Sequence, residues 1–563
     1  MDLLTCAALA LVNSLLFARL GYCNGPEQLT GRQTFAIIFI LQYLSLKYYH
    51  VFFYHKYFSP LRHLPGPKDN HWILGQVLNQ VKADLPMAMW VKWSREHPEA
   101  PLIRYLSLAN TEMILVNSLE ANRQVLQSQN DFFERPNAVK RMVGRYGGNG
   151  LTSFECEEYR AHRKMLSGCF TPDCLRRLEP VFKEKAAQLN RFFDRAIEAA
   201  GGTSVVIDCT DTFDRFALDI MGRALWGVDF SYLEHTQFDR NGRPVKVAGQ
   251  YGVLEAHDAV FGPDKMGKIF TFLDVLFPTR WIPCNTNAKF LRATSWMDAL
   301  VRQLVANRRK EYARTTEKAE HHDTSRDILS FLIEESMPRG CAEGIQDKNI
   351  VGHLLILMVG GHETTAHMLA WSSHVLATRP DIQDRLREDI FGLAARSPDP
   401  SFNEIDALSY VDNFVNEVLR VYPPAVWTAR QAYRDTQICG TYIPKGTLFE
   451  IVPAVTHMNP LIWGDDAAEV NPSRWDSVGI DGPEEDPRSS PFVFEPFTNG
   501  PKTCIGKRVA LCEIKIALFE MVRRYRFVGL PEGEAGPPFT VESPGIILRP
   551  KGMKVRVERI GDE

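Results

Sequence analysis

After residue 68, apolar positions recur mostly every three or four residues, which is the spacing of helices that bury one face. This spacing predicts long helices over residues 175–200, 290–318, 348–376, 380–394 and 405–421. A further amphipathic helix is predicted over residues 507–525. Strand-like runs are few and short, at residues 102–108, 112–116, 441–453 and 554–560. We therefore expect a mainly α fold with small β-sheets.

The first sixty residues contain two apolar runs, at 3–20 and 34–46. Each is at or below the length of about 20 apolar residues that spans a bilayer. A cleaved signal peptide is the alternative for the first run, but Asp2 replaces the usual positive charge and no clear cleavage site follows. We therefore expect residues 1–60 to form a retained membrane anchor, in which one or both runs cross.

The segment LRHLPGPK, residues 61–68, places two prolines around a glycine and cannot continue a helix. We interpret it as a proline-rich hinge between the anchor and one large catalytic domain, residues 69–563. The chain has 563 residues, is 45% hydrophobic and carries a net charge of −3, so nothing in its charge indicates a nucleic-acid partner. Its 11 cysteines are irregularly spaced and form no CxxC pair, which argues against zinc and against a disulfide scaffold.

The segment FTNGPKTCIG, residues 497–506, places Cys504 in a glycine-rich loop directly before a predicted helix. Backbone N–H groups of a turn and of a helix N-terminus stabilise a thiolate, and glycines allow a flat ligand to approach the backbone. A haem iron held by one thiolate fits this pattern. A small buried thiol remains the alternative on loop chemistry alone, whereas a papain-like nucleophile and zinc lack the residues that they need.

The same segment resembles the haem-binding signature of the cytochrome P450 family. Its signature positions are occupied by Phe497, Gly500, Cys504 and Gly506, and Lys502 stands where a basic residue usually lies. The resemblance implies the P450 fold, haem b held by Cys504 as axial iron ligand, and O2 as co-substrate.

Three further motifs carry the resemblance in the family's order. The NEVLRVYPP segment resembles the ExxR helix, and NPSRW resembles the segment that completes its network, so Glu417, Arg420 and Arg474 are expected to act structurally. The spacing itself carries no information, because Glu157 and Arg160 share it. MVGGHETTAH, residues 358–367, resembles the oxygen-binding helix segment.

The adjacent glycines of that segment cost a helix about 1 kcal/mol each, so we expect close packing or an opened helix there. The resemblance implies that Thr364 orients a proton donor or water and that Glu363 recharges the relay. EYRAHRKML resembles the segment that contacts a haem propionate, with Arg163 retained and Tyr159 in place of tryptophan. Arg430 is expected to bind the other propionate, and a surface ion pair is its alternative.

By resemblance, the chain is a microsomal, fungal-like monooxygenase of the endoplasmic reticulum membrane, with its catalytic domain facing the cytosol. Only 57 residues follow Gly506, so electrons are expected from a separate NADPH-dependent cytochrome P450 reductase, with cytochrome b5 as a further candidate partner. The expected substrate is a lipophilic intermediate of secondary metabolism, terpenoid or polyketide in type. Its pocket would be lined by Trp427 and by residues 139–150, 355–364, 425–429 and 545–547.

Other functions stay open at this point. Fatty-acid or xenobiotic hydroxylation is the alternative within the same reaction class. A haem-thiolate isomerase or dehydratase would need no external electrons, and a membrane haem carrier or sensor would need no turnover.

Overall fold

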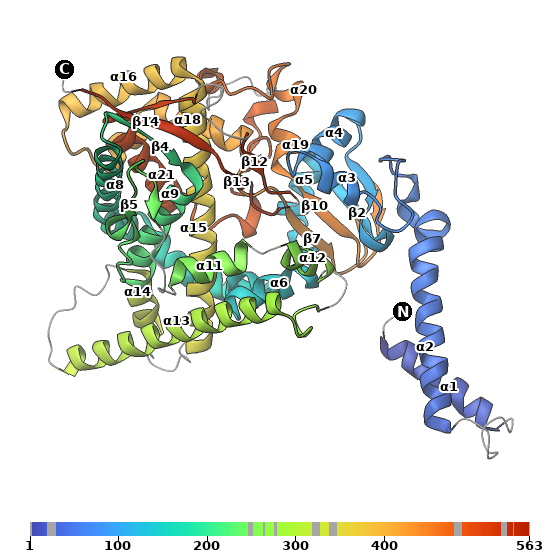
Figure 1. The fold of residues 1–563 in the computed structure, drawn as a ribbon. Helices are drawn as coiled ribbons and strands as arrows, with labels where there is room; N and C mark the ends of the chain where they lie inside the picture. Colours follow the sequence, from blue (N-terminus) through green and yellow to red (C-terminus); the bar gives the residue numbers. More distant parts are fainter. Residues whose placement is uncertain are drawn as a thin grey trace.

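The computed structural model describes residues 3–19, 30–245, 252–262, 265–274, 278–317, 327–336, 346–477, 487–530, 538–543 and 545–561. Its central element is the long helix α15 (Asp347–Thr378), which runs through the middle of the molecule (Figure 1). The helices that pack against α15 include α9 (Cys209–Met221), α13 (Asn285–Glu317), α18 (Ser409–Val421) and α21 (Lys507–Val522). The prediction of a mainly α fold with small sheets is confirmed.

The helices begin and end where the sequence supplies caps. In α8 (Pro172–Ala200), the Thr171 side chain accepts a hydrogen bond from the Cys174 N–H and proline stands at the first position. Gly201 ends the helix in the left-handed conformation, with φ +69°. The periodic residues of α8, among them Phe182 and Phe193, are buried against the core.

Five predicted helices correspond to α8, α13, α15, α21 and α16 (Pro380–Arg396), within a few residues at each end as far as the described residues extend. The sixth prediction, 405–421, is wrong as a single helix. The chain forms α17 (Phe402–Asp406) and α18, separated by Ala407 and Leu408. Leu408 has extended backbone angles, so the apolar spacing continues across a turn that breaks the helix.

The larger sheet has five strands in the order β1-β2-β10-β7-β3. These strands are β1 (Leu102–Leu106), β2 (Glu112–Val116), β10 (Leu448–Ile451), β7 (Thr428–Ala432) and β3 (Phe133–Glu134). Only β2 and β10 pair in parallel. A second sheet joins β11 (Tyr525–Val528), β14 (Lys554–Arg559) and β4 (Ser204–Asp208). The sheets thus join segments far apart in sequence and hold the ends of the helical body together.

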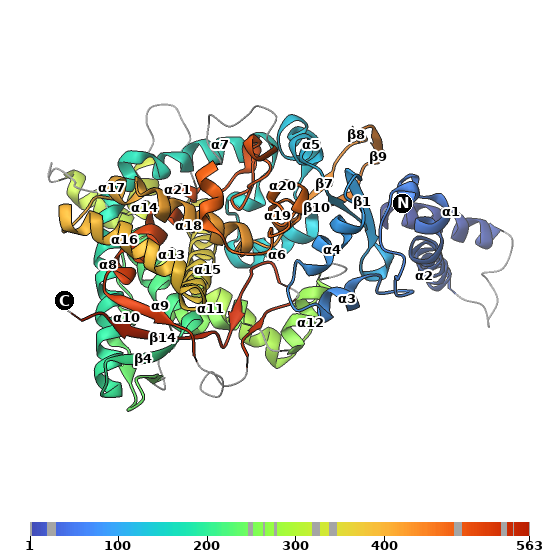
Figure 2. The same cartoon turned by 90° about the horizontal axis from the view of Figure 1, so that it is seen from above.

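The two N-terminal helices project from the body on the side of the larger sheet (Figures 1 and 2). α1 (Leu3–Arg19) packs beside α2 (Gly31–Tyr49), which continues as a π-helix over His50–Phe58. Within the part of the chain that the structure describes, one helix, Arg32–Phe58, is long and apolar enough to cross a membrane, and none of its most apolar window is buried. The apolar helix Ala7–Leu16 is shorter than a span. The longer helix therefore fits a membrane anchor.

The last turns of this helix are bonded to the body. The Arg104 guanidinium in β1 donates to the His55 carbonyl at 2.6 Å, and the Asn110 amide donates to the Val51 carbonyl at 2.9 Å. A Cβ at Gly66 would lie 1.8 Å from the Arg104 carbonyl oxygen, so the proline-rich segment lies directly against β1.

Candidate active site

The loop that carries Cys504 is held in one shape by its backbone. The Cys504 N–H donates to the Phe497 carbonyl at 2.9 Å, and Gly500 has φ +74°. A Cβ at Gly500 would lie 1.9 Å from the Leu126 carbonyl oxygen, so this position requires glycine for both conformation and space. Helix α21 begins directly after Gly506. The loop therefore presents Cys504 at the N-terminal end of a helix, as the sequence predicts.

The Cys504 thiol lies among protein groups yet has accessible surface. The residue is exposed, although burial by the surrounding protein raises the pKa of its thiol. The backbone N–H groups of Gly506 and Lys507 and the Arg163 guanidinium lower this pKa, but burial outweighs them in the free thiol. A metal cation bound to the sulfur would reverse this balance.

Arg430, in β7, is a buried cation with an unused donor. Its Nη1 donates to the Thr428 hydroxyl at 3.1 Å and to the Ala429 carbonyl at 2.9 Å, whereas its buried Nε has no partner among the described residues. Burial lowers its pKa to about 10. With 3% of its surface exposed, Arg430 does not suit a surface ion pair. A carboxylate such as a haem propionate would satisfy the orphaned N–H.

Helix α7 (Cys156–Ser167) binds the backbone of the cysteine loop. The Arg163 Nη1 donates to the Thr503 carbonyl at 2.8 Å, and the Tyr159 hydroxyl donates to the Pro501 carbonyl at 3.2 Å. Both predicted site residues are thus placed beside Cys504. The Tyr159 hydroxyl is occupied by the loop itself, and its role towards a cofactor stays a prediction.

Lys502 contacts a carboxylate that sequence reasoning missed. Its ammonium donates to the Glu155 carboxylate and, at 3.3 Å, to the Phe133 carbonyl. Glu155 also pairs with Arg135 at 3.4 Å. Burial lowers the pKa of Lys502 to about 8, against the attraction of Glu155. Lys502 therefore ties the cysteine loop to the segment before α7, and no pattern in the sequence marks Glu155 for this contact.

One face of α15 is open in the middle of an otherwise buried helix. Gly360 is exposed and a Cβ there would meet nothing within 4 Å, while Thr364, one turn later, is partly exposed. The Thr364 hydroxyl donates to the Gly360 carbonyl at 2.8 Å. Gly361 shows the expected close packing, because a Cβ there would lie 2.4 Å from the Met221 sulfur. The alternative of an opened helix is not found, since α15 stays α-helical through both glycines.

Glu363 lies on a different side of α15 and is buried. Its Oε1 is 3.6 Å from Arg549 Nη1 and 3.8 Å from His257 Nε2. Burial raises the pKa of Glu363 to about 8, partly opposed by the Arg549 charge. The side chain is therefore a neutral acid at pH 7. Its partners come from other elements, and no local motif indicates them.

Glu417 and Arg420 form a fully buried pair in α18. The guanidinium donates Nε–H and Nη2–H to the two carboxylate oxygens, both at 2.8 Å. The same carboxylate accepts from Arg474 Nε at 3.3 Å, from Trp475 Nε1 at 2.9 Å and from the Asn471 N–H at 2.8 Å. The structure thus brings together the three residues expected to form a network.

His457 connects this network to the cysteine loop. Its Nδ1 lies 3.1 Å from the Arg420 carbonyl, and its Nε2 accepts the Glu495 N–H at 2.9 Å. Since a carbonyl only accepts and a backbone N–H only donates, Nδ1 carries the hydrogen. Burial lowers the pKa of His457 to about 3, so the ring is neutral. Sequence reasoning missed this residue.

The four predicted lining segments meet in pairs. Residues 425–429 run beside 545–547, with the Val426 N–H donating to the Ile546 carbonyl at 2.8 Å. Residues 139–150 meet 355–364 at Gly150, after α6 (Asn137–Gly147), where a Cβ would lie 2.5 Å from Ile356 Cγ1 of α15.

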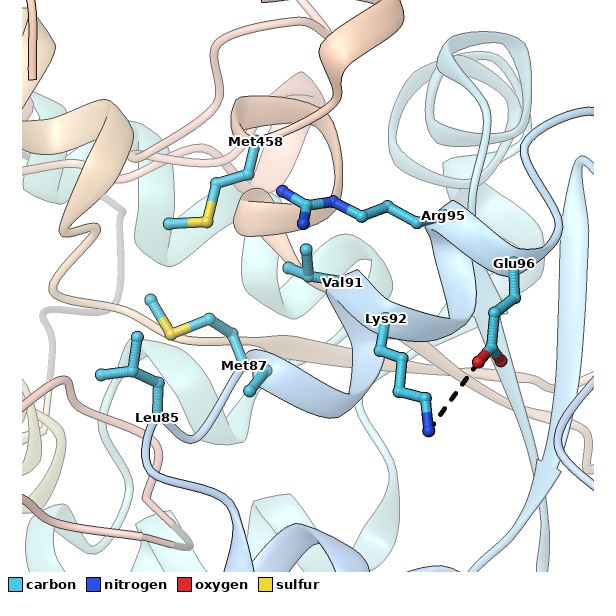
Figure 3. A pocket seen from close by; sticks show the side chains of 8 residues that line it. Leu85, Met87, Val91, Lys92, Arg95, Glu96 and Met458 are labelled. Carbon is cyan, nitrogen blue, oxygen red and sulfur yellow. Dashed lines mark ion pairs between the residues drawn. The ribbon is translucent and has the colours of Figure 1, made fainter. Parts of the chain in front are cut away.

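A different hollow lies on the surface beside α4 (Ala88–Glu96), between Met87 and Met458 (Figure 3). Its rim carries the Lys92–Glu96 ion pair, at 3.7 Å. None of its lining residues is a predicted site residue. It is therefore not the candidate active site.

Comparisons with known proteins agree with this geometry. The family model described as "Cytochrome P450" matches residues 65–557. The chain is 28% identical to cytochrome P450 monooxygenase sphH of Aspergillus fumigatus, covering 88% of each chain. It is 26% identical to cytochrome P450 monooxygenase FUM15 of Gibberella moniliformis, over 84% of this chain and 83% of the relative. It is also 26% identical to cytochrome P450 monooxygenase FSL4 of Gibberella zeae, over 93% of each.

The family binds haem and uses O2, and the residues described here fit such a group: an accessible sulfur at a helix end, a buried guanidinium with an unused N–H, and an open helix face. With the family model matching most of its length, this chain belongs to the cytochrome P450 family and is a monooxygenase.

Proposed function

We propose that this monooxygenase inserts one oxygen atom from O2 into a lipophilic intermediate of secondary metabolism, terpenoid or polyketide in type, using electrons from a separate NADPH-dependent reductase. The observation that carries the proposal is the accessible Cys504 sulfur in a loop whose burial opposes a free thiolate.

The haem, when bound, supplies O2 activation and the transfer of one oxygen atom. Cys504 would hold its iron, and Arg430 would bind a propionate through the unused Nε–H. Arg163 and Tyr159 keep the cysteine loop in place through two backbone carbonyls. Phe497, Gly500, Lys502 and Gly506 shape and tether that loop.

Thr364 and Glu363 are proposed to handle protons. The Thr364 hydroxyl is oriented by the Gly360 carbonyl on the open face of α15, where it can position a water. Glu363 is buried, neutral at pH 7 and next in the chain, so it can hold the proton that this water passes on. Burial of the acid also keeps bulk water away from it.

The substrate class is supported by the lining and by the relatives. Trp427 is partly buried in the 425–429 segment, and the neighbouring Ile546 and Ile547 are apolar and partly accessible. The relatives named above are fungal monooxygenases of similar length. An apolar helix near the N-terminus supports a membrane location, proposed to be the endoplasmic reticulum with the catalytic domain in the cytosol. A reductase, with or without cytochrome b5, would then dock from the same membrane.

The test supplies the full-length chain with a reductase in a fungal host and compares lipid-soluble extracts with those from a Cys504→Ala strain. We expect at least one metabolite to be converted, only with intact Cys504, into a product that carries label from isotopically labelled O2. If only fatty acids or foreign compounds are converted, they are the substrates in place of the proposed class. An unlabelled product formed without reductase would indicate an isomerase or dehydratase. Stoichiometric haem without any turnover would indicate a carrier or sensor.

A further inference from the structure

A group of ionisable side chains closes around Glu363 on the side of α15 away from the open face. We call the following five residues the Glu363 cluster: Asp214, His257, His362, Glu363 and Arg549. They come from α9, α11 (Val253–Phe261), α15 and the segment before β13 (Pro550–Lys551). All are buried except Arg549, whose side chain is 12% exposed.

The cluster forms a closed circuit of contacts. Arg549 bridges the two carboxyls on one side, with Nη1 3.6 Å from Glu363 Oε1 and Nη2 3.4 Å from Asp214 Oδ2. The histidines bridge them on the other side, since His362 Nε2 is 3.7 Å from Asp214 Oδ1 and His257 Nε2 is 3.8 Å from Glu363 Oε1. The two imidazoles are joined at 3.0 Å.

Hydrogen-bond chemistry defines how the histidines are protonated. The Asp214 backbone carbonyl can only accept, so His362 Nε2, 3.0 Å away, carries a hydrogen. The other nitrogen of a neutral His362 is then an acceptor, and His257 Nε2 must donate to it. The N–H of His257 therefore lies between His362 and the Glu363 carboxyl, while its buried Nδ1 has no partner among the described residues.

Charge balance leaves one proton on the two carboxyls. Arg549 supplies one permanent positive charge, and burial lowers the pKa values of His257 and His362, which stay neutral. A single carboxylate neutralises Arg549. A second would be a buried anion without a counter-charge, at a cost of several kcal/mol. Burial accordingly raises the pKa values of both Asp214 and Glu363.

Other groups near the cluster do not supply a positive charge for a second carboxylate. The remaining charged or titratable neighbours include His367, Asp258 and Glu542, together with Asp208 and Asp211, whose negative charges also raise the pKa of Asp214. Burial keeps His367 neutral as well. Glu542 is paired with Lys268 and Lys551, and the side chain of Asp258 is 52% exposed, 3.9 Å from Arg549. The Asp258–Arg549 contact is where the cluster reaches solvent.

We propose that Asp214 and Glu363 share one buried proton across Arg549 and the histidine pair, and that this reserve supplies the Thr364 side through Glu363. When Glu363 gives up this proton, both side chains are carboxylates against the single charge of Arg549. The cluster then takes up one proton from solvent at the Asp258 edge; this proton binds the Asp214 carboxylate and moves on to Glu363, and Asp214 returns to the carboxylate that balances Arg549. One proton leaves and one enters in each cycle, so the starting charge is restored.

This inference rests on the proposed role of Glu363 and Thr364. Asp214 and the imidazoles do not touch the reacting groups, so they act as positioning and reserve residues. The test of these residues therefore uses a signal other than overall turnover.

The first measurement needs no turnover. Infrared spectra of the full-length holoenzyme in H2O and D2O at pH 7 report protonated carboxyl groups. We expect Asp214→Asn to lose one carboxylic-acid signal, because Arg549 then pairs with Glu363 alone and that carboxyl ionises. The matched control is Asp211→Asn, on the same helix, whose side chain is 38% exposed and pairs with Arg215 at 3.0 Å. The control should keep every such signal.

The second measurement uses reductase, NADPH and O2, and follows peroxide released per NADPH together with the solvent isotope effect on NADPH oxidation. Asp214→Asn and His257→Gln should each raise both quantities roughly twofold or more, since general acid catalysis contributes that much or more. Asp211→Asn should match the wild type. His257→Gln keeps both carboxyls, so it should retain the infrared signal and still serves if Asp214→Asn fails to fold.

Two results would overturn the shared-proton reserve. One is wild-type peroxide release and a wild-type isotope effect in both Asp214→Asn and His257→Gln. The other is an unchanged infrared signal in Asp214→Asn. Glu363→Gln and Thr364→Val separate this failure from that of the proposed function. If these two variants raise peroxide release while the cluster variants do not, only the reserve is wrong. If Glu363→Gln and Thr364→Val also match the wild type, the proton role of this site is wrong.

Discussion

Replacing Arg420 by lysine should destabilise the fold strongly while keeping its charge. The guanidinium makes five hydrogen bonds and is fully buried: two to Glu417, and one each to the carbonyls of His457, Ala467 and Glu469. Lysine has three donors on one nitrogen, so at least two of these acceptors lose their partner. With about 1–3 kcal/mol for each unpaired buried group, we expect a loss of about 4 kcal/mol.

The chain contains a matched control with the same spacing. Arg160 pairs with Glu157 three residues earlier, but these side chains are 53% and 84% exposed. Such a pair contributes at most about 1 kcal/mol, so Arg160→Lys should have almost no effect. The assay is urea unfolding of the full-length protein in detergent, followed by circular dichroism and haem absorbance. Equal midpoints for the two variants would refute the argument that burial, not spacing, gives the pair its energy.

The remaining predictions concern the cysteine loop, Glu450 and the N-terminal helices. Cys504→Ser should keep the circular dichroism of the protein but change the spectrum of its reduced carbon-monoxide complex; an unchanged spectrum would contradict the ligand assignment. Gly500→Ala should lower haem retention, because its Cβ would lie 1.9 Å from a carbonyl oxygen, whereas Gly440→Ala, with φ +78° and nothing within 4 Å, should cost only about 1 kcal/mol of backbone strain. Burial raises the pKa of Glu450 from 4.5 to about 7, so its contribution to stability is complete below pH 4.5 and is lost as the pH rises through 7. In urea titrations, the free energy of unfolding of the wild type should therefore fall by up to about 3 kcal/mol between pH 4.5 and 7, and Glu450→Gln should remove this fall. The same dependence on pH in both proteins would refute the assignment. Deleting residues 1–58 should release the protein from the membrane fraction after high-pH washing, and continued sedimentation would show a second membrane contact.

Much of the fold could be predicted because the long helices carry a strong local signal. α8, α15 and α21 each show apolar periodicity over several turns, and α8 has clear caps. Short strands were harder. β7 pairs with β3, and β4 with β14, and in both cases the partner lies far away along the chain. A run of three to five residues has no period of its own to detect.

The candidate site also has parts that the sequence predicts and parts that it does not. The Cys504 loop and the Gly360–Thr364 turn are local, so their residues could be named from short motifs. The contacts that decide their chemistry are not local. The orphaned Nε–H of Arg430 depends on burial, and the neutral state of Glu363 depends on its burial among residues of other elements, against the opposing charge of Arg549.

The hydrogen bonds from Arg104 to His55 and from Asn110 to Val51 have a mechanical consequence. They act on the last turns of the apolar helix, so the catalytic body cannot swivel freely about its attachment. In a lipid bilayer, these bonds would keep one face of the body at a constant height and tilt above the surface. Substrates dissolved in the lipid would always meet the same side of the enzyme. An electron donor that diffuses in the same membrane would search two dimensions rather than three.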